Sequence, residues 1–339
     1  MRGIAFLGNK QVALSEFPDP TPSSGEVIIE VKASGMCGSD LHNYRKPEKQ
    51  TALIIAGHEP AGVVAAVGPG VRENVARLGQ RVMVHHYHGC TACAHCRTGW
   101  PQLCTTAPVQ VYGVNANGAH APYLKVPADT LVSLDDSLSF MAGAAIACGT
   151  GTAWGALRRM KLSGRDTLAV FGQGPVGLSA TLLASAQGAR VIALDIEPRR
   201  LEKARDFGAD VLINPKEQDS IEAIKAVTSG QGASKALETS GSSIAARDAL
   251  ACLDKWGIAC FVGLGAEVKF DVREFLRSQM TVLTSWTMSI VGQKKCADFI
   301  VDRSLDIDRL FTDHWKLEQA EEAYRHFDLQ NSGKGVFLV

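Results

Sequence analysis

Hydrophobic and polar residues alternate in two different ways along the chain, and the change falls near residue 150. Before it, short β-like runs such as residues 25–34 (GEVIIEVKAS) and 79–87 (GQRVMVHHY) are separated by turns rich in glycine and proline. This pattern is typical of an antiparallel or barrel-like region whose loops carry function. We therefore expect a β-rich region over residues 1–150.

After residue 150, apolar runs alternate with amphipathic stretches such as residues 197–208 and 219–230. Alternation of strands and helices in this way predicts a doubly wound parallel sheet. The strands that we expect cover residues 166–172, 190–195, 210–214, 235–241, 257–265 and 280–286.

The last part of the chain has a different pattern. Residues 294–305 and 316–327 are patterned as helices, and residues 334–339 as a closing strand. These elements need not belong to the parallel sheet. We therefore divide the chain into residues 1–150, 151–289 and 290–339.

Composition and charge exclude several classes of protein. The 339 residues are 46% apolar and 21% charged, which is ordinary for a globular protein with two domains. Because 35 basic residues balance 35 acidic ones, we expect no nucleic-acid partner and no acidic membrane surface. The N-terminus has no signal-peptide pattern, and the longest apolar stretches are interrupted by Gly, Gln and Arg. We expect a cytoplasmic protein without a membrane partner.

A glycine pattern begins the parallel-sheet region. Gly172, Gly174 and Gly177 follow an expected strand in the spacing G-x-G-x-x-G, and Pro175 and Val176 lie within the same turn. The first glycine allows a tight turn, the second lets a pyrophosphate approach the backbone, and the third lets helix and strand pack closely. The pattern predicts a dinucleotide-binding loop.

An acidic residue follows this loop at the distance expected for a ribose ligand. Asp195 ends the next strand, 18 residues after Gly177, where a carboxylate binds the adenosine ribose and repels a 2′-phosphate. Asp195 could instead cap the following helix. Arg200 either touches the ribose or adenine or is simply solvated. We expect NAD rather than NADP as the cofactor.

Four cysteines lie close together in residues 88–104 (HGCTACAHCRTGWPQLC). Cys90, Cys93, Cys96 and Cys104 have the spacing C-x2-C-x2-C-x7-C. In a reducing compartment such thiols bind a metal more often than they form disulfides. Four thiolates complete a tetrahedron around zinc and leave no position for substrate, so we expect a structural zinc. An iron–sulfur cluster is the alternative.

A second group of metal-binding residue types is scattered along the sequence. Cys37, His58 and Cys148 each have an ordinary explanation as buried residues. Together they form a three-ligand shell with an open fourth position, which a catalytic zinc requires. Glu59 either orients this shell or binds the metal when water leaves.

Residues 57–71 (GHEPAGVVAAVGPGV) resemble the signature of the zinc-containing medium-chain dehydrogenase/reductase family, the alcohol dehydrogenases. The CGSDLH turn at residues 37–42, the four-cysteine lobe, Cys148 and the glycine pattern also occur in the family's order. The similarity covers essentially the whole chain. It implies an α/β protein with a GroES-like catalytic domain, made from both chain ends, and a Rossmann domain between them.

The resemblance also implies roles for individual residues. Cys37, His58 and Cys148 correspond to the ligands of the catalytic zinc, with Glu59 beside them. Ser39 takes the place of the hydroxyl that relays a proton, and His42 that of the outer proton acceptor. The family implies two zinc ions per subunit and a homo-oligomer, as a tetramer more often than a dimer.

The resemblance implies an NAD-dependent zinc alcohol dehydrogenase that acts on a primary or secondary alcohol. A polyol or L-threonine-type dehydrogenase is the alternative, because Gly38 is common in those relatives whereas Cys148 is the choice of alcohol dehydrogenases. A zinc-free reductase would not need the Cys37, His58 and Cys148 set. A non-enzymatic zinc-lobe binding protein is a further alternative, against which the lobe offers Arg97 as its only fixed positive charge.

Overall fold

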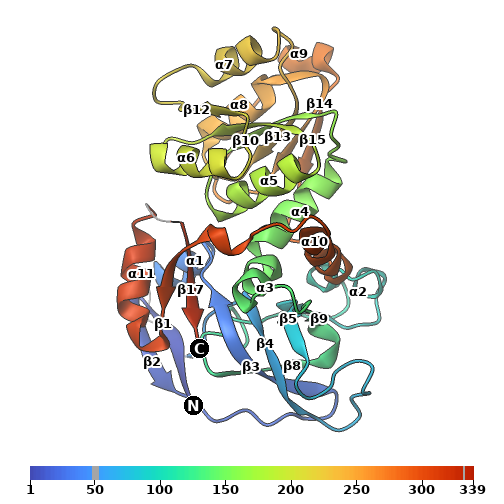
Figure 1. Ribbon diagram of the computed structural model, residues 1–339, viewed down its shortest axis with the longest axis vertical. Coiled ribbons are helices and arrows are strands. Elements are labelled where there is room, and N and C mark those ends of the chain that lie inside the picture. Colours follow the sequence, from blue (N-terminus) through green and yellow to red (C-terminus); the bar gives the residue numbers. More distant parts are fainter. Residues whose placement is uncertain (48–52, 331–332) are drawn as a thin grey trace. The chain divides into compact units, whose positions relative to one another are not determined.

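Two β-sheets from different parts of the sequence organise the chain (Figure 1). The computed structural model describes residues 1–47, 53–330 and 333–339. One structural unit consists of Met1–Gly151 together with Met288–Val339, and the other of Thr152–Thr287.

The larger sheet lies in the first unit and has the strand order β16-β17-β3-β4-β5-β9, with β8 also paired to β3. Its neighbouring strands are antiparallel except for β16 and β17, which are parallel. Two small hairpins, β1-β2 and β6-β7, accompany it. The strands are β1 (Arg2–Gly8), β2 (Gln11–Glu16), β3 (Glu26–Gly35), β4 (Pro60–Val67), β5 (Arg81–Val84), β6 (Tyr87–His88), β7 (Gln110–Val111), β8 (Tyr123–Pro127), β9 (Leu131–Ser133), β16 (Phe311–Trp315) and β17 (Lys334–Leu338).

The C-terminal segment completes this first unit. Strand β17 pairs antiparallel with β3, where Val336 lies opposite Gly35. Helix α11 (Ala320–Asp328) precedes β17 and buries Ala320, Ala323, Tyr324 and Phe327. These positions recur at intervals of three and four, which places them on one helix face. The apolar stripe therefore packs α11 onto the core of the unit.

The core beneath α11 is rich in aromatic rings. Phe6 and Tyr324 meet edge to face, with centroids 4.9 Å apart, and Tyr44 lies 5.7 Å from Tyr324. Phe337 from β17 belongs to the same cluster. Residues from both ends of the chain thus share one hydrophobic core, which holds the C-terminal segment in place.

The other helices of the first unit range from four residues in α2 to 13 in α10. Ser139 begins α3 by accepting a hydrogen bond from the Ala142 N–H, and Ser289 begins α10 in the same way with Gly292. The helices are α1 (Asp40–Tyr44), α2 (Ala94–Arg97), α3 (Phe140–Ala147), α10 (Ile290–Asp302) and the start of α4 (Gly149–Arg159).

The second unit contains the six-stranded parallel sheet, in the order β12-β11-β10-β13-β14-β15. The predicted doubly wound α/β fold is confirmed. Four of the five residues of β10 are buried, as expected for a sheet covered on both faces. The strands are β10 (Thr167–Phe171), β11 (Arg190–Leu194), β12 (Val211–Ile213), β13 (Ala233–Glu238), β14 (Leu253–Phe261) and β15 (Thr281–Thr284), and the helices are α5 (Pro175–Ala186), α6 (Pro198–Asp206), α7 (Ser220–Val227), α8 (Ser243–Ala251) and α9 (Val272–Phe275).

Two expected strands are displaced by a few residues. β13 ends at Glu238 because the Glu238 carboxylate accepts hydrogen bonds from the backbone N–H groups of Ser240 and Gly241, which form a turn. β14 ends at Phe261, because the next two N–H groups, of Val262 and Gly263, both donate to Glu238 O and so leave the regular ladder. In both cases the apolar run in the sequence includes glycines that lie beyond the last residue of the strand.

Over the described ranges, no single helix is both long and apolar enough to cross a membrane. Helices α3 and α4 meet that test only when they are taken together, across a bend of 51°.

A buried histidine links β5 to α10 and predicts a pH effect on stability. His85 Nδ1 lies 3.0 Å from Gln293 Oε1, so the neutral ring donates this bond. Burial lowers the pKa of His85 to about 4. The unfolded chain therefore binds a proton near pH 6.5 that the folded chain does not bind, and stability is lost as the pH falls from about 6.5 towards 4.

We predict that His85→Gln reduces this loss. Between pH 7.5 and 5.5 the wild-type free energy of unfolding should fall by about 1 kcal/mol more than that of the variant. Urea unfolding of both proteins at the two pH values measures the difference. Equal losses in the two proteins would show that His85 titrates normally in the folded state.

Candidate functional site

The first candidate site brings together residues from three separate turns of the β-rich unit. Cys37 lies between β3 and α1, His58 and Glu59 directly precede β4, and Cys148 ends α3. One ligand atom from each of the four lies within 4.8 Å of the others. Cys148 and His58 are buried, and Cys37 is half-buried. Residues that are distant in sequence therefore share one polar cluster.

The spacing of the sulfur atoms fits a tetrahedral zinc. Cys37 Sγ and Cys148 Sγ are 3.9 Å apart. Two thiolates bound to zinc at ~2.3 Å each are separated by about 3.8 Å in a tetrahedron. With His58 this makes three ligands and leaves one position for another oxygen ligand, so the donor set fits a catalytic rather than a closed structural site.

The ring of His58 is oriented by a buried carboxylate. Asp40 Oδ1 lies 3.0 Å from His58 Nδ1, and both side chains are almost fully buried. Asp40 Oδ2 accepts a hydrogen bond of 2.9 Å from the Cys37 N–H. Nδ1 therefore carries the proton, and the other ring nitrogen, Nε2, is directed at the cluster. Carboxylate support of this kind fixes the tautomer of a metal-binding histidine.

The two thiols of this site share a proton. Hydrogen bonding with Cys148 is the main cause that holds the pKa of Cys37 well below its usual value. The same bond, together with burial, raises the pKa of Cys148 well above its usual value. Cys37 is therefore the thiol that loses its proton first. A metal that binds both sulfurs must displace the proton of Cys148 to make it a second thiolate ligand.

Ser39 lies beside these ligands, whereas His42 lies further out. Ser39 Oγ is 3.2 Å from Cys37 Sγ and 3.2 Å from His58 Nε2. His42 is exposed on α1, one turn further along the chain. The structure therefore places a hydroxyl at the metal cluster and an imidazole at the surface of the same short helix.

Glu59 faces a buried cation that the sequence analysis overlooked. Lys334, the first residue of β17, pairs with the Glu59 carboxylate and also donates to Met36 O at 3.1 Å. Burial raises the pKa of Glu59 to about 8, which Lys334 opposes. A Cβ at Gly35 would lie 2.0 Å from Glu59 Oε2, so glycine is needed there. This arrangement holds the carboxylate beside the cluster.

His86 adjoins the same cluster. Its ring centroid is 5.0 Å from that of His58, and its Nδ1 lies 3.3 Å from Ala147 O. Burial lowers the pKa of His86 well below its usual value, so the ring is neutral. A neutral imidazole with one nitrogen held by the backbone can offer its other nitrogen to a neighbouring hydroxyl.

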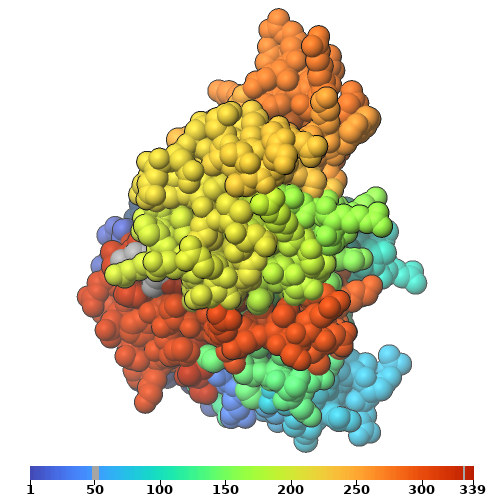
Figure 2. Space-filling model, turned by 45° about the horizontal axis from the view of Figure 1, so that its top comes forward, coloured from blue at the N-terminus to red at the C-terminus, as the bar shows by residue number. Residues whose placement is uncertain are grey.

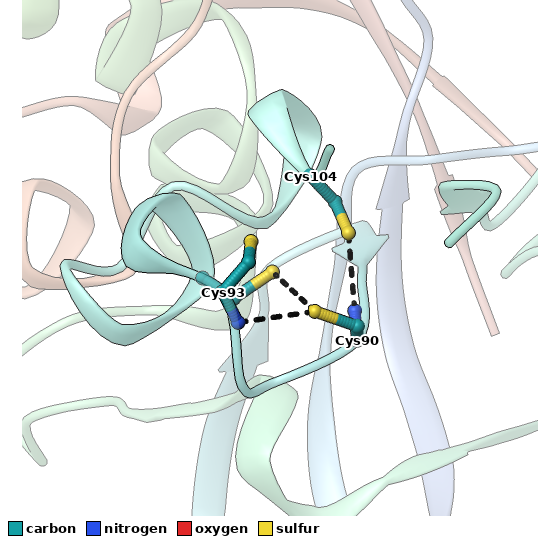
Figure 3. Close-up of side chains that lie close together, drawn as sticks. Cys90, Cys93 and Cys104 are labelled. Atoms are coloured by element: carbon teal, nitrogen blue, oxygen red, sulfur yellow. Dashed lines mark hydrogen bonds between the residues drawn. The ribbon is translucent and has the colours of Figure 1, made fainter. Parts of the chain in front are cut away.

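The four-cysteine lobe forms the second candidate metal site (Figure 3). Its ligand atoms also lie within 4.8 Å of one another, and Cys90 Sγ is 3.9 Å from Cys96 Sγ. Backbone N–H groups point at the sulfurs, from Cys93 to Cys90 Sγ at 3.2 Å and from Cys90 to Cys104 Sγ at 3.4 Å. This donor set fits a closed tetrahedral metal. All nine cysteines of the chain are free thiols.

Backbone hydrogen bonds prepare the lobe for deprotonation. Donation from Thr106 and Cys90 lowers the pKa of Cys104 to about 5, and donation from Cys96 and Thr105 lowers that of Cys93 to about 7. Burial raises the pKa of Cys96 to about 12. A bound cation would reverse this last effect, because it stabilises all four thiolates.

The glycine loop has the geometry that a pyrophosphate site requires. Gly172 has a φ of +90°, and a Cβ at Gly177 would lie 1.9 Å from Gly172 O. At Gly174 a Cβ would meet nothing within 4 Å. Helix α5 begins next to this space, with Pro175 and Val176 in its first turn. Its first N–H groups have no partners within the helix, which makes the helix start suitable for an anion.

Asp195 connects the loop to the strand end. Its Oδ2 accepts a 2.6 Å hydrogen bond from the Gln173 N–H, and its Oδ1 accepts one of 2.9 Å from the Glu197 N–H. Arg200 lies 3.8 Å from the same carboxylate. The carboxylate thus contacts the glycine loop, as expected for a residue beside the dinucleotide, and also the start of α6, as expected for a helix cap.

Sequence reasoning missed the residues that support the metal ligands. Asp40 lay within the quoted CGSDLH turn but received no role. Lys334 had a usable signal, since a lysine in an otherwise apolar closing strand must find a buried partner.

Comparison with known families agrees with this geometry. Residues 23–136 match the family model described as alcohol dehydrogenase GroES-like domain, and residues 175–302 match the one described as zinc-binding dehydrogenase.

Curated relatives resemble the chain over nearly its full length. An uncharacterized zinc-type alcohol dehydrogenase-like protein, YphC, of Escherichia coli (strain K12) is 36% identical over 97% of this chain and 96% of its own. A sorbitol dehydrogenase of Bacillus subtilis (strain 168) is 33% identical over 95% and 92%. An L-threonine 3-dehydrogenase of the same strain is 30% identical over 95% and 92%.

Solved structures have the same fold. Alcohol dehydrogenase TADH from Thermus sp. ATN1 superimposes with a TM-score of 0.91, at 29% identity over all of both chains. A short chain alcohol dehydrogenase (rspB) from E. coli CFT073, complexed with NADH, gives a TM-score of 0.88 at 26% identity, over 100% of this chain and 99% of its own.

The thiol pKa values predict how the metal-free lobe reacts. After metal is removed with a chelator, iodoacetamide at pH 6 should modify Cys104 much faster than Cys260, because the thiolate is the nucleophile and burial raises the pKa of Cys260 to about 12. Peptide mass spectrometry follows both sites. Adding zinc back should protect Cys104. A Cys104 alkylation rate that rises with an apparent pKa near 8.5 would contradict the prediction.

Proposed function

Because the chain belongs to the zinc-containing medium-chain dehydrogenase/reductase family, we propose that it is an NAD-linked alcohol dehydrogenase with two zinc ions per subunit. It interconverts a primary or secondary alcohol and the corresponding aldehyde or ketone by hydride transfer. One zinc is catalytic, at Cys37, His58 and Cys148, and the other is structural, at Cys90, Cys93, Cys96 and Cys104.

One observation carries the proposal. Cys37 Sγ and Cys148 Sγ lie 3.9 Å apart, and Asp40 directs His58 Nε2 at the same point. The fourth member of the cluster, Glu59, is paired with Lys334, so three side chains are left to serve as ligands. A closed site would hold a metal but exclude substrate. Three ligands with an open position instead suit an ion that binds and polarises a substrate oxygen.

When bound, zinc acts as a Lewis acid that lowers the pKa of an alcohol hydroxyl, and NAD accepts the hydride. The chain's own residues handle the proton. The Ser39 hydroxyl, 3.2 Å from two of the ligands, accepts it next to the substrate. His42, exposed on the following helix, is the proposed exit to solvent. Glu59 lies in the same cluster, and because its carboxylate is paired with Lys334 it would orient the ligands rather than bind the metal.

Asp195 supports NAD as the preferred cofactor. Its carboxylate contacts the backbone of the glycine loop through Gln173, so it stands beside the proposed pyrophosphate site. A negative charge there repels the 2′-phosphate of NADP. Arg200, 3.8 Å away, weakens this repulsion without abolishing it. The structural relative complexed with NADH is consistent with the same choice.

Two classes of substrate are candidates. The sorbitol and L-threonine dehydrogenases among the relatives support a polyol or 3-hydroxy amino acid as the second candidate. His86, a neutral polar side chain next to His58, favours a substrate with a second hydrogen-bonding group near the reacting hydroxyl.

We further propose a cytoplasmic homo-oligomer. Reducing conditions keep its nine cysteines as thiols. β15 ends the parallel sheet, and Thr281, Val282 and Thr284 on it are exposed. Exposed apolar side chains lie on the neighbouring segment, orange in Figure 2: Leu264, Phe270, Val272 and Leu276. An open sheet edge beside apolar surface favours pairing with a second copy.

Zinc content and activity test the proposal together. We predict two zinc ions per chain in the wild type, one in Cys37→Ser and one in Cys93→Ser, by elemental analysis. Cys37→Ser should reduce NAD at a rate at least 100-fold lower on every alcohol and polyol that the wild type oxidises, because a ligand of the catalytic ion is lost. Cys93→Ser should retain activity per folded molecule.

The matched variants separate the two metal sites. A single zinc in the wild type, unchanged in Cys37→Ser and lost in Cys93→Ser, would leave the lobe as the only metal site and exclude zinc catalysis. A wild type that reduces NADP faster than NAD would contradict the role of Asp195.

The proton path predicts a specific effect of Ser39. Ser39→Ala should lower kcat by roughly 10²-fold or more, as expected when a positioned proton acceptor is removed. Both zinc ions should remain bound, because Ser39 is not a ligand. Steady-state kinetics and zinc analysis of the same sample measure the two effects. Ser39→Thr keeps the hydroxyl and serves as the control, and unchanged turnover in Ser39→Ala would remove Ser39 from the path.

A further inference from the structure

A chain of buried polar contacts begins at the Asp40 carboxylate, whose Oδ1 faces His58 Nδ1 at 3.0 Å. Beyond Asp40, the Tyr324 hydroxyl lies 3.4 Å from Asp40 Oδ2 and 2.8 Å from His120 Nε2. His120 Nδ1 in turn lies 2.7 Å from Ser34 Oγ. Ser34, His120 and Tyr324 have no exposed surface, and Asp40 is 3% exposed. The chain crosses the β-rich unit from the metal cluster to helix α11.

The donors along this chain can be assigned in one direction. Asp40 is a carboxylate, so each group facing it must donate, and Tyr324 therefore gives its O–H to Oδ2. The Tyr324 oxygen then accepts from His120 Nε2–H, and His120 Nδ1 accepts from the Ser34 hydroxyl. Burial lowers the pKa of His120 to about 4, so its ring is neutral, with one donor and one acceptor nitrogen. Every member is satisfied only in this arrangement.

The contact between Tyr324 and Asp40 is long for a hydrogen bond between two oxygens. At 3.4 Å it exceeds the usual 2.7–2.8 Å by roughly 0.6 Å. The Tyr324 hydroxyl nevertheless points at the Asp40 carboxylate. If its O–H turned away, lone pairs of the two oxygens would face each other, which is unfavourable. Tyr324 therefore faces Asp40 as a donor, beside the Cys37 N–H and the His58 Nδ1 that contact the same carboxylate.

The backbone fixes His120 at the far end. Its N–H donates to Ala56 O at 2.9 Å, and its carbonyl accepts from Ile4 at 2.9 Å. A Cβ at Gly57, the residue before His58, would lie 2.4 Å from His120 Nδ1, and Gly57 has a φ of +90°. Only glycine lets the His120 ring lie against the backbone next to a metal ligand. The chain is therefore anchored on the segment that carries His58.

Packing alone does not require these polar groups. The Tyr324 ring packs with Phe6, Tyr44 and Phe337, and a phenylalanine would fill the same space. Burying a hydroxyl and an imidazole is costly unless their hydrogen bonds are satisfied. What the hydroxyl adds is a donor aimed at the carboxylate that orients His58.

We propose that Tyr324 and His120 are positioning residues for the catalytic metal, acting through Asp40 to keep His58 Nε2 directed at Cys37 and Cys148. The inference rests on the proposed function in that the ion held there is zinc. It gives the C-terminal helix α11 a part in metal retention without contact with the metal. Buried outer partners of a metal-binding histidine typically change metal affinity by roughly 10- to 100-fold, and more remote ones by less.

The test compares zinc release from Tyr324→Phe and from Tyr44→Phe. Tyr44 belongs to the same aromatic cluster and is also buried, with 4% of its surface exposed, but its change leaves the Asp40 chain intact. The zinc-loaded proteins are mixed with excess chromogenic chelator, and the release phase that is missing in Cys37→Ser identifies the catalytic site. We expect that phase to be roughly three- to tenfold faster in Tyr324→Phe and unchanged in Tyr44→Phe, with Asp40→Asn faster still.

Two further measurements separate positioning from general loosening of the fold. The visible spectrum of the cobalt-substituted protein should change in Tyr324→Phe and not in Tyr44→Phe, because the histidine ligand reorients. His120→Asn should speed release as well, and the double variant should be no faster than the faster single one, since both act through one chain.

Each result has a definite consequence. Release from Tyr324→Phe at the rate of Tyr44→Phe, with an unchanged cobalt spectrum, would overturn the inference while leaving the proposed function intact. A release profile of Cys37→Ser identical to the wild type would overturn the proposed function itself, and the inference with it.

Discussion

The antiparallel pairing of β17 with β3 is the contact on which the rest of the β-rich unit depends. It joins the last residues of the chain to the strand that leads into Cys37. Through it, Lys334 reaches Glu59 and α11 is held over the aromatic core. Without this pairing, the ligand turns would lose the cation and the tyrosine that support them. The geometry of the metal cluster is thus set by the C-terminal segment as much as by the turns that supply the ligands.

Buried charge is tolerated in this unit because each charge has a partner. Asp40 is matched by His58 and by the Cys37 N–H, and Glu59 by Lys334. A buried ion pair is a weak source of stability, since desolvation offsets most of the attraction, but it is a strong source of orientation. Gly35 and Gly57 also contribute to this orientation, because the absence of a side chain leaves room for the Glu59 carboxylate and the His120 ring.

Much of the fold and of the metal cluster could be predicted from the sequence. The features that could not be predicted depend on contacts that form only in the folded chain. The parallel sheet was predictable because its strands are short apolar runs and amphipathic helices such as α6 and α7 alternate with the later ones, and the glycine loop because its spacing is local. The zinc-type family followed from motifs of a few residues each. The strand ends at Glu238 and Phe261 were missed, since both depend on hydrogen bonds to Glu238 that form only in the folded chain. The support of His58 was missed because Tyr324 and His120 approach it only through tertiary folding.

The division of the chain has a consequence for how the protein is made. The unit that binds the proposed catalytic metal is interrupted by Thr152–Thr287 and resumes at Met288. Cys37, His58 and Cys148 therefore leave the ribosome long before β17 exists to pair with β3. The parallel-sheet unit, continuous in sequence, can fold during synthesis, whereas the N-terminal segment must wait with the end of β3, at Ala33–Gly35, lacking its β17 partner. Truncation of even the last strand would leave a nascent chain with all its metal ligands and no completed site to hold them.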